Sequence, residues 1–265
     1  MKRNVFHPFL FATLIVIVVG LACSLTAPAT QTAPEPVVPP TSVQSEPTST
    51  QVPPTVPPTP TDVPPPTATP LIPFFKQEFD TDVLSSWSPF MIVGDNKSDK
   101  RKSSLTIDNG KLIFKLEDEQ LYSYLIYEDQ TYDDVRVEVS ADNRGKNNNN
   151  ISLVCRYSDE GWYEFSVMSS GLFQIWAYDA TGAVHKGYNL VNSGGTNAIK
   201  MGMETNVYAI VCSGNQLTLY INGEKSTSFT ESKYGFTDGK VGINVSSLNV
   251  IPIIVEFEYF DIQEP

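Results

Sequence analysis

The stretch at residues 151–178 constrains the fold of this chain more than any other. It holds three runs of alternating apolar and polar side chains, separated by short turns that contain glycine: residues 152–157, 162–168 and 172–178. Alternation with a period of two is typical of β-strands, and short turns between the runs predict an antiparallel meander. We expect the more apolar face of each strand to join the core: Leu153, Cys155, Tyr157, Tyr163, Phe165, Val167, Phe173, Ile175 and Ala177.

The opposite faces of these strands mix aromatic and polar side chains. Sugar rings stack on tryptophan and tyrosine, while charged and amide side chains supply hydrogen bonds to their hydroxyl groups. The pattern therefore predicts a ligand-binding face, formed by Arg156, Glu164, Gln174, Trp176 and Tyr178. The alternative is an ordinary solvated sheet, in which a loop half covers Trp176 and Arg156 forms a cross-strand pair with Glu164.

The first 23 residues have the features of an export signal. Lys2 and Arg3 precede an apolar segment at residues 9–22, which is short for a membrane span and typical of a signal peptide. The segment ends in Gly20-Leu21-Ala22-Cys23, which resembles the lipobox of bacterial lipoproteins, where the cysteine is lipidated after cleavage. We expect a lipoprotein anchored to the cell membrane through Cys23; an uncleaved N-terminal anchor or simple secretion are the alternatives. All three place the remainder of the chain outside the cytoplasm.

Residues 24–73 form a linker rich in proline and threonine. They hold 16 of the 20 prolines in the chain. Such a segment buries too little apolar surface to offset its conformational entropy, so we expect it to be disordered. In the extended polyproline conformation, about 3.1 Å per residue, it would hold a domain up to about 150 Å from its anchor. We expect a spacer with no specific partner of its own.

Residues 74–265 then form one folded domain. Because residues 1–73 contribute three acids and two bases, the domain retains 27 acidic and 16 basic residues and a net charge of about −11. Nucleic acid binding needs a basic surface, so this charge argues against it.

Two cysteines remain in the domain, Cys155 and Cys212. Both lie in strand-like runs at phases that point inward. An isolated pair in an exported protein tends to be oxidised, so we predict a Cys155–Cys212 disulfide between strands. Two buried free thiols are the alternative.

The rest of the domain alternates in the same way. We predict further strands at residues 74–79, 104–107, 111–116, 121–127, 135–141, 184–190, 207–212, 216–221, 227–229, 239–245 and 253–262. Residues 80–88, 143–150 and 191–198 are predicted loops, and Asn222-Gly223 is a strong hairpin signal. About a dozen short strands without a long helix predict an all-β protein with two packed antiparallel sheets.

The order of these segments resembles the concanavalin A-like lectin/glucanase superfamily, a jelly-roll sandwich. The resemblance covers about residues 75–264 and rests on Phe79-Asp80, Trp87, DNGKL (108–112), DVRVEV (134–139), VCRY (154–157), WYEF (162–165), LTLYING (217–223), GKVGI (239–243) and VEFEYF (255–260). It is most similar to laminin G-like and 3-keto-disaccharide hydrolase-like bacterial extracellular domains. The resemblance implies a ligand on the concave face of a sheet or at its loop rim.

The sequence offers little for catalysis. Retaining glucanases of this fold carry an E-x-D-x-x-E run, which places two carboxylates on one face about 5–5.5 Å apart, and no such run occurs here. A Ser-His-Asp triad needs a histidine, and the domain has only His185, which we expect in a surface loop. We expect no cofactor. Structural calcium would find hard oxygen ligands at Asp80, Asp82, Asp261 and residues 147–150, but these have no fixed spacing.

The sequence therefore favours a surface-tethered, non-catalytic module that binds glycan or another extracellular polymer. A glycoside-acting hydrolase of the same fold and an extracellular protein-interaction module are the alternatives.

Overall fold

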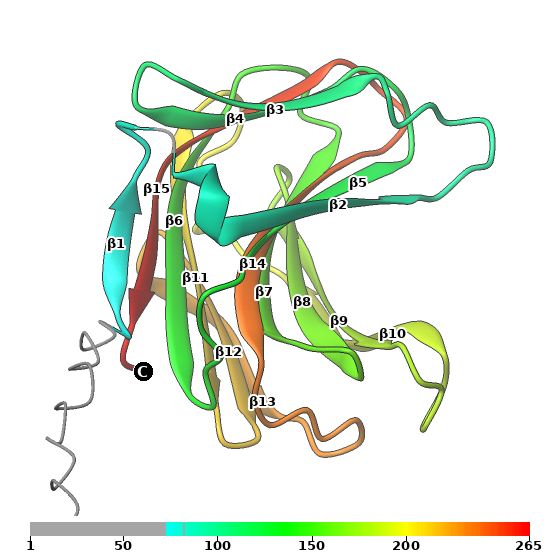
Figure 1. Cartoon of the computed structure of the whole chain (residues 1–265), viewed down its shortest axis with the longest axis vertical. Coiled ribbons are helices and arrows are strands. Elements are labelled where there is room, and N and C mark those ends of the chain that lie inside the picture. Colours follow the sequence, from blue (N-terminus) through cyan, green and yellow to red (C-terminus); the bar gives the residue numbers. More distant parts are fainter. Residues whose placement is uncertain (1–72, 82) are drawn as a thin grey trace, which may run out of the picture. The chain divides into compact units, whose positions relative to one another are not determined.

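Two antiparallel β-sheets face each other in the computed structural model, which describes residues 73–81 and 83–265 (Figure 1). One sheet has eight strands in the order β13-β12-β11-β6-β15-β4-β3, with β1 also paired to β15. Its strands are β1 (Phe75–Glu78), β3 (Ser103–Asp108), β4 (Lys111–Leu116), β6 (Val135–Asn143), β11 (Thr205–Ser213), β12 (Gln216–Ile221), β13 (Glu224–Thr230) and β15 (Ile253–Gln263).

The other sheet has seven strands in the order β10-β9-β8-β7-β14-β5-β2. They are β2 (Trp87–Val93), β5 (Leu121–Tyr127), β7 (Asn149–Tyr157), β8 (Gly161–Met168), β9 (Leu172–Asp179), β10 (Gly187–Gly195) and β14 (Lys240–Ser247). A short 3-10 turn, η1 (Leu84–Ser86), precedes β2. The predicted all-β, two-sheet jelly-roll sandwich is confirmed.

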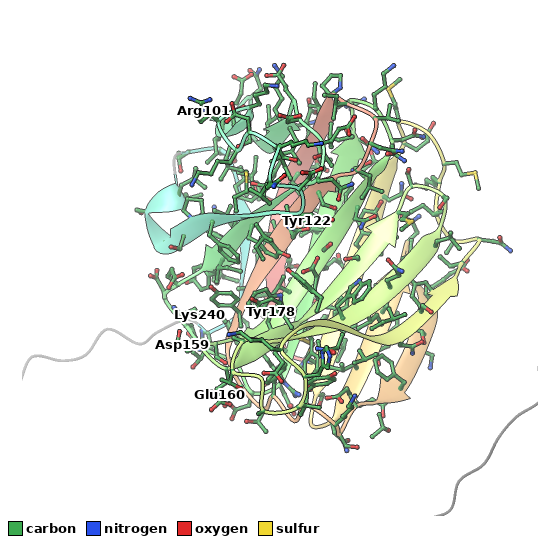
Figure 2. The ribbon with its side chains drawn as sticks, turned by 90° about the vertical axis from the view of Figure 1, so that its right-hand side faces the viewer. Arg101, Tyr122, Asp159, Glu160, Tyr178 and Lys240 are labelled. Atoms are coloured by element: carbon green, nitrogen blue, oxygen red, sulfur yellow. A yellow bond between two sulfur atoms is a disulfide. The ribbon has the colours of Figure 1, made fainter. Side chains whose placement is uncertain are left out.

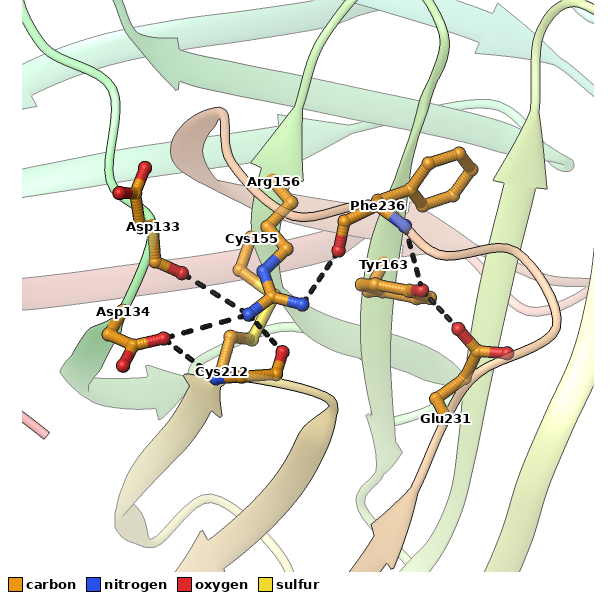
Figure 3. Close-up of a disulfide and its surroundings, with 9 residues drawn as sticks. Asp133, Asp134, Cys155, Arg156, Tyr163, Cys212, Glu231 and Phe236 are labelled. Carbon is orange, nitrogen blue, oxygen red and sulfur yellow. Dashed lines mark hydrogen bonds and ion pairs between the residues drawn. A yellow bond between two sulfur atoms is a disulfide. The ribbon is translucent and has the colours of Figure 1, made fainter.

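The core lies between the inner faces of the two sheets. The predicted inward residues of β7, β8 and β9 are buried there together with the valines of β6, as period-two alternation requires. Tyr157 is the exception, because it packs on the outer face of the seven-stranded sheet with Trp162. Cys155 and Cys212 form the predicted disulfide, with their Cα atoms 6.8 Å apart. It joins β7 to β11 and thus one sheet to the other (Figure 3).

Two edge strands differ from the prediction. Residues 87–93 form β2 although Pro89 lies inside them, because β2 pairs with β5 on one side and its other side is the sheet edge. Residues 191–195 were predicted as a loop, but β10 continues to Gly195 beyond a β-bulge after Leu190. The predicted Asn222-Gly223 turn is confirmed, with φ of 51° and 81°.

The predicted signal peptide, Cys23 and residues 24–72 of the linker lie outside the described residues. Their roles stay predictions. Within the part of the chain that the structure describes, no helix has the length and hydropathy needed to span a membrane.

Candidate functional site

The seven-stranded sheet curls so that its outer face is concave. Four strands separate β5 from β10 in the sheet, yet the hydroxyl groups of Tyr124 on β5 and Tyr188 on β10 share a hydrogen bond. The two sides of the groove therefore approach each other closely enough for their side chains to touch. Figure 2 looks onto this face, with Tyr122 and Tyr178 labelled on it.

A pocket of about 350 Å³ lies in this groove. Strands from one sheet edge to the other contribute to it, because every second residue of each strand points to this face. Its lining consists of Ile92, Gly94, Tyr122, Tyr124, Asn150, Glu164, Ser166, Met168, Gln174, Trp176, Tyr188 and Leu248. The volume is at the lower end of the range for small-molecule sites.

Glu164 is the buried acid of the pocket, with 4% of its surface exposed. Tyr124 donates a hydrogen bond of 2.7 Å to its Oε2 atom, and Ser166 donates one of 3.1 Å to its Oε1 atom. Within residues 73–81 and 83–265 no basic side chain forms an ion pair with it. Burial raises the pKa of Glu164 above its ordinary value, although the hydrogen bond from Tyr124 opposes the shift. Such an acid is a mark of functional sites.

Two polar atoms near the floor of the pocket have no hydrogen-bond partner among the described residues. They are Oδ1 of Asn150, which is a lining residue, and Oγ of Ser246, which is its cross-strand neighbour on β14. Both side chains are at least nine-tenths buried. Unsatisfied buried polar groups are costly, so these two atoms are free to accept a hydrogen bond from an ordered water or from a ligand.

The aromatic side chains beside the pocket form a continuous cluster. Phe90 stacks on Tyr124 with ring centroids 4.4 Å apart, and Trp162 stacks on Tyr178 at 4.0 Å. Tyr188 meets Tyr178 edge-on at 4.8 Å and Trp176 at 6.3 Å.

Three of the five predicted ligand-binding residues line the pocket together: Glu164, Gln174 and Trp176. They face one another because β8 and β9 pair with Glu164 opposite Trp176 and Ser166 opposite Gln174. Tyr178 lies in the adjoining aromatic cluster, stacked on Trp162.

The structure does not bring Arg156 to this face. Arg156 has a φ of +55° at a β-bulge, where the pairing of β7 with β14 shifts by one residue between Lys240 and Gly242. The bulge reverses the alternation, so that Tyr157 turns to the outer face and the guanidinium turns away from Glu164. The expected cross-strand pair does not form, because Val154 is the residue opposite Glu164.

The guanidinium of Arg156 instead ties three loops together near the disulfide (Figure 3). It donates to the backbone carbonyls of Phe236 at 2.7 Å, Gly214 at 2.6 Å and Asp133 at 3.2 Å. The residue is 3% exposed. These contacts give Arg156 a structural position apart from the pocket.

The sequence interpretation missed the far side of the groove. Ile92, Tyr122, Tyr124 and Tyr188 come from β2, β5 and β10, which approach β8 and β9 because the sheet curls. The alternation in residues 121–127 places Tyr122 and Tyr124 on one face of the strand, so the sequence could have predicted that they lie together. The alternation does not show whether this face points outward or into the core, because both faces of the strand carry large apolar side chains.

Among the described residues, the proposed calcium ligands do not form a cluster of acidic side chains. Residues 73–81 and 83–265 contain no group of three or more His, Cys, Asp or Glu side chains that could hold a metal ion. Asp82, one of the proposed calcium ligands, lies outside these residues. His185 is exposed in the loop before β10, as expected.

Comparisons with known proteins agree with this fold. Residues 75–254 match the family of 3-keto-alpha-glucoside-1,2-lyase-like domains. No curated protein sequence matches the chain.

Solved structures share the architecture at low identity. A native glycosidic hydrolase is 16% identical, with a TM-score of 0.54, over 75% of this chain and 100% of that one. A Bacillus subtilis protein of unknown function with a galectin-like fold has a TM-score of 0.56 at 10% identity, over 72% and 94%. A family 16 glycoside hydrolase from Bacteroides ovatus has a TM-score of 0.53 at 13% identity, over 71% and 99%.

These likenesses confirm the concanavalin A-like sandwich expected from the sequence. Because the family match spans more than half of the chain and contains the pocket up to Leu248, the chain belongs to the family of 3-keto-alpha-glucoside-1,2-lyase-like domains.

Proposed function

We propose that the domain binds a glycan in the concave pocket of the seven-stranded sheet. The observation that carries this proposal is the position of Trp176, a partly exposed indole beside the polar groups of Glu164 and Gln174. An aromatic ring next to convergent hydrogen-bonding groups suits a sugar, which has apolar C–H faces and a rim of hydroxyl groups.

The relatives support the choice of ligand class. The matching family takes its description from a 3-keto-alpha-glucoside lyase, and the Bacteroides ovatus structure is a complex with the glucan product G4G4G3G. A structure of LamA from Z. galactanivorans, with a TM-score of 0.51, is a complex with laminaritriose and laminaritetraose.

Calorimetry with glycans found by array screening tests the proposal. We expect Trp176→Ala in the full-length protein to weaken binding at least tenfold, about 1.4 kcal/mol, because the stacking surface is lost. Tyr220→Ala is the matched control, since Tyr220 is a partly buried aromatic residue on β12 of the other sheet. Equal effects of the two substitutions, or no binding to any glycan, would contradict the proposal.

A second candidate function is catalysis on a glycoside in the same pocket, favoured by the buried Glu164 and by the family description. Glu164 is the single carboxylate among the described residues that line the pocket, whereas hydrolysis by the usual route needs two. A 1,2-elimination needs one group to take the proton from C2 of the sugar and one to protonate the departing C1 oxygen. The ionised form of Glu164 would take the C2 proton, and the Tyr124 hydroxyl, which donates a hydrogen bond of 2.7 Å to it, would protonate the departing oxygen.

Product analysis after incubation with 3-keto-glucosides distinguishes the two functions. Release of the aglycone by the wild type but not by Glu164→Gln would establish the enzyme. Binding without release would leave the module non-catalytic.

The proposed location follows from residues outside the described part. A lipid on Cys23 and the proline-rich linker would hold the domain outside the cell membrane. Metabolic labelling with a radioactive fatty acid tests this, since Cys23→Ser should abolish the label and release the protein from the membrane fraction.

A further inference from the structure

The groove on the seven-stranded sheet is closed at one end by aromatic rings. We call the six residues that close it the aromatic wall: Phe90, Tyr124, Tyr157, Trp162, Tyr178 and Tyr188. Successive rings are 4.0–6.0 Å apart, from Phe90 on edge strand β2, through Tyr124 and Trp162, to Tyr178 and then Tyr188 on edge strand β10. The wall therefore crosses the whole width of the concave face.

Strand register places the pocket on one side of this wall. From Trp162, the residues of β8 that share its face are Glu164, Ser166 and Met168 in order, and all three line the pocket. Their neighbours on β9 are Trp176 and Gln174, while Tyr178 opposite Trp162 belongs to the wall. Moving along the strands, the groove thus changes from aromatic wall to pocket.

The pocket is open at the end opposite the wall. At the far end, Met168 and Leu248 are half-buried and Gly94 is exposed, whereas Glu164 next to the wall is 4% exposed. A ligand that reaches Glu164 has to enter from the Met168 end. It cannot continue along the strands, because Trp162 and Tyr178 fill the groove beyond this point with rings 4.0 Å apart.

A contact between side chains also bridges the groove at this depth. The hydrogen bond between the Tyr124 and Tyr188 hydroxyl groups joins the two sides of the groove directly. A chain lying along the groove would have to pass through this contact, and a chain lying across the strands would meet the two sides of the groove, which approach each other here.

The lining also restricts the charge of the ligand. Among the described residues the pocket contains one acid, Glu164, and no Lys or Arg. A ligand with a carboxylate or sulfate would lack a countercharge and would be buried beside a carboxyl group, which is unfavourable. An uncharged sugar avoids this cost.

We infer that the pocket binds the terminal unit of an uncharged glycan, inserted end-on with its last ring against Trp176 and its hydroxyl groups near Glu164, and does not bind internal segments of a polymer. This inference rests on the proposed glycan-binding function and specifies its substrate class. A free oligosaccharide and the end of a polymer present the same terminal unit, so both qualify as ligands.

The experiment asks whether the amount of protein bound follows the number of glycan chain ends or the mass of the glycan. The full-length protein is titrated by calorimetry with neutral glucans in three forms: linear oligosaccharides of two to eight units, cyclic oligosaccharides of the same linkage, and the polymer before and after partial acid hydrolysis. We expect one protein molecule to bind per linear chain at every chain length. The cyclic forms should bind at least tenfold more weakly. The amount of protein bound per gram of polymer should rise in proportion to the number of chain ends that hydrolysis creates. Oligosaccharides that end in a uronic acid should bind at least tenfold more weakly than their neutral counterparts.

The outcomes separate the inference from the function it rests on. Capacity that follows polymer mass, or equal binding of cyclic and linear forms, would overturn end-on binding and leave glycan binding intact. Absence of binding to every form would overturn both.

A variant of the wall provides an independent check. Tyr188→Ala removes the contact across the groove from edge strand β10, and we expect the capacity per gram of unhydrolysed polymer to rise at least twofold. His185→Ala is the control, because His185 is exposed in the loop just before β10. An unchanged ratio of polymer to oligosaccharide binding in Tyr188→Ala would contradict the role of the wall.

Discussion

At the residue scale, Glu164 is the most informative side chain of the domain. It is a buried carboxyl group held by Tyr124 and Ser166 with no basic partner among the described residues. Burying an unpaired charge is expensive, so the surroundings favour the protonated form. An apolar residue at this position would stabilise the sheet more, so the buried acid is better explained by a role in ligand binding than by a role in stability.

The raised pKa of Glu164 makes stability depend on pH. The folded pKa lies above the ordinary value of 4.5, so the folded state holds the proton more tightly than the unfolded state does. This contribution to stability is complete below pH 4.5 and is lost as pH rises through the folded pKa. We expect urea denaturation to show the wild type losing stability relative to Glu164→Gln over this range, by about 1.4 kcal/mol per pKa unit of the shift.

Glutamine keeps the size of the side chain and one of its two acceptor oxygens but does not titrate, so the change of the stability difference with pH isolates the titration. Parallel stability curves for the two proteins across this pH range would contradict the raised pKa.

Arg156 is the residue whose role the sequence pattern predicted least well. Alternation placed it on the binding face, but the bulge buries it, and a one-residue bulge leaves no pattern in residues 152–157 that identifies it. We expect Arg156→Met to lower the free energy of unfolding by about 3 kcal/mol, because three backbone carbonyls lose their donor.

Arg101→Met is the matched control, since Arg101 is an exposed arginine paired with Asp99. We expect this control to leave stability unchanged. Calorimetric titration of folded Arg156→Met should give wild-type glycan affinity, whereas selective loss of affinity with normal stability would return Arg156 to the binding site.

At the scale of elements, the sequence predicted most strands correctly because their two faces differ. In β6 the valines at 135, 137 and 139 are buried and the intervening side chains are half-buried, so alternation is easy to read. Edge strands give a weaker signal, since they pair on one side and tolerate proline and glycine. The two strand segments that the prediction missed, β2 with Pro89 and the end of β10 with Gly194-Gly195, are of this kind.

The disulfide cross-links the two sheets through side chains. It closes a loop with a sequence separation of 57 residues, so it restricts the unfolded chain considerably. We expect the Cys155→Ala/Cys212→Ala variant to lose about 2–4 kcal/mol of stability in urea denaturation while keeping its glycan affinity when folded.

Alkylation of the denatured, unreduced protein followed by peptide mapping checks the bond itself. Modified thiols at Cys155 and Cys212 would show that the two residues are free.

At the scale of the whole molecule, the two sheets present different outer faces. The eight-stranded sheet carries ion pairs on its outer side, including Lys111 with Glu256 and Arg136 with Glu138. The seven-stranded sheet carries the aromatic wall and the pocket. Surface ion pairs belong to a solvated face, whereas a concave pocket lined by aromatic groups and a few polar groups is typical of a binding face.

The composition of this face was predictable from the sequence, but its shape was not. Alternation brought Glu164, Gln174 and Trp176 together, because they are neighbours on adjacent strands of one meander. The far side of the pocket depends on the curl of seven strands, which brings Tyr124 and Tyr188 into contact across 64 residues of sequence. Strand patterns carry no information about that curvature.

The three tryptophans offer the most direct measurement of the central claim. Trp87 lies in the core between the sheets, Trp162 in the aromatic wall and Trp176 in the pocket. We would follow their indole N–H signals by NMR while titrating the full-length protein with a neutral oligosaccharide that binds. Glycan binding in the pocket predicts the largest saturable shift for Trp176, a smaller one for Trp162 and none for Trp87. Binding that leaves Trp176 unmoved would place the ligand elsewhere and contradict the proposed site.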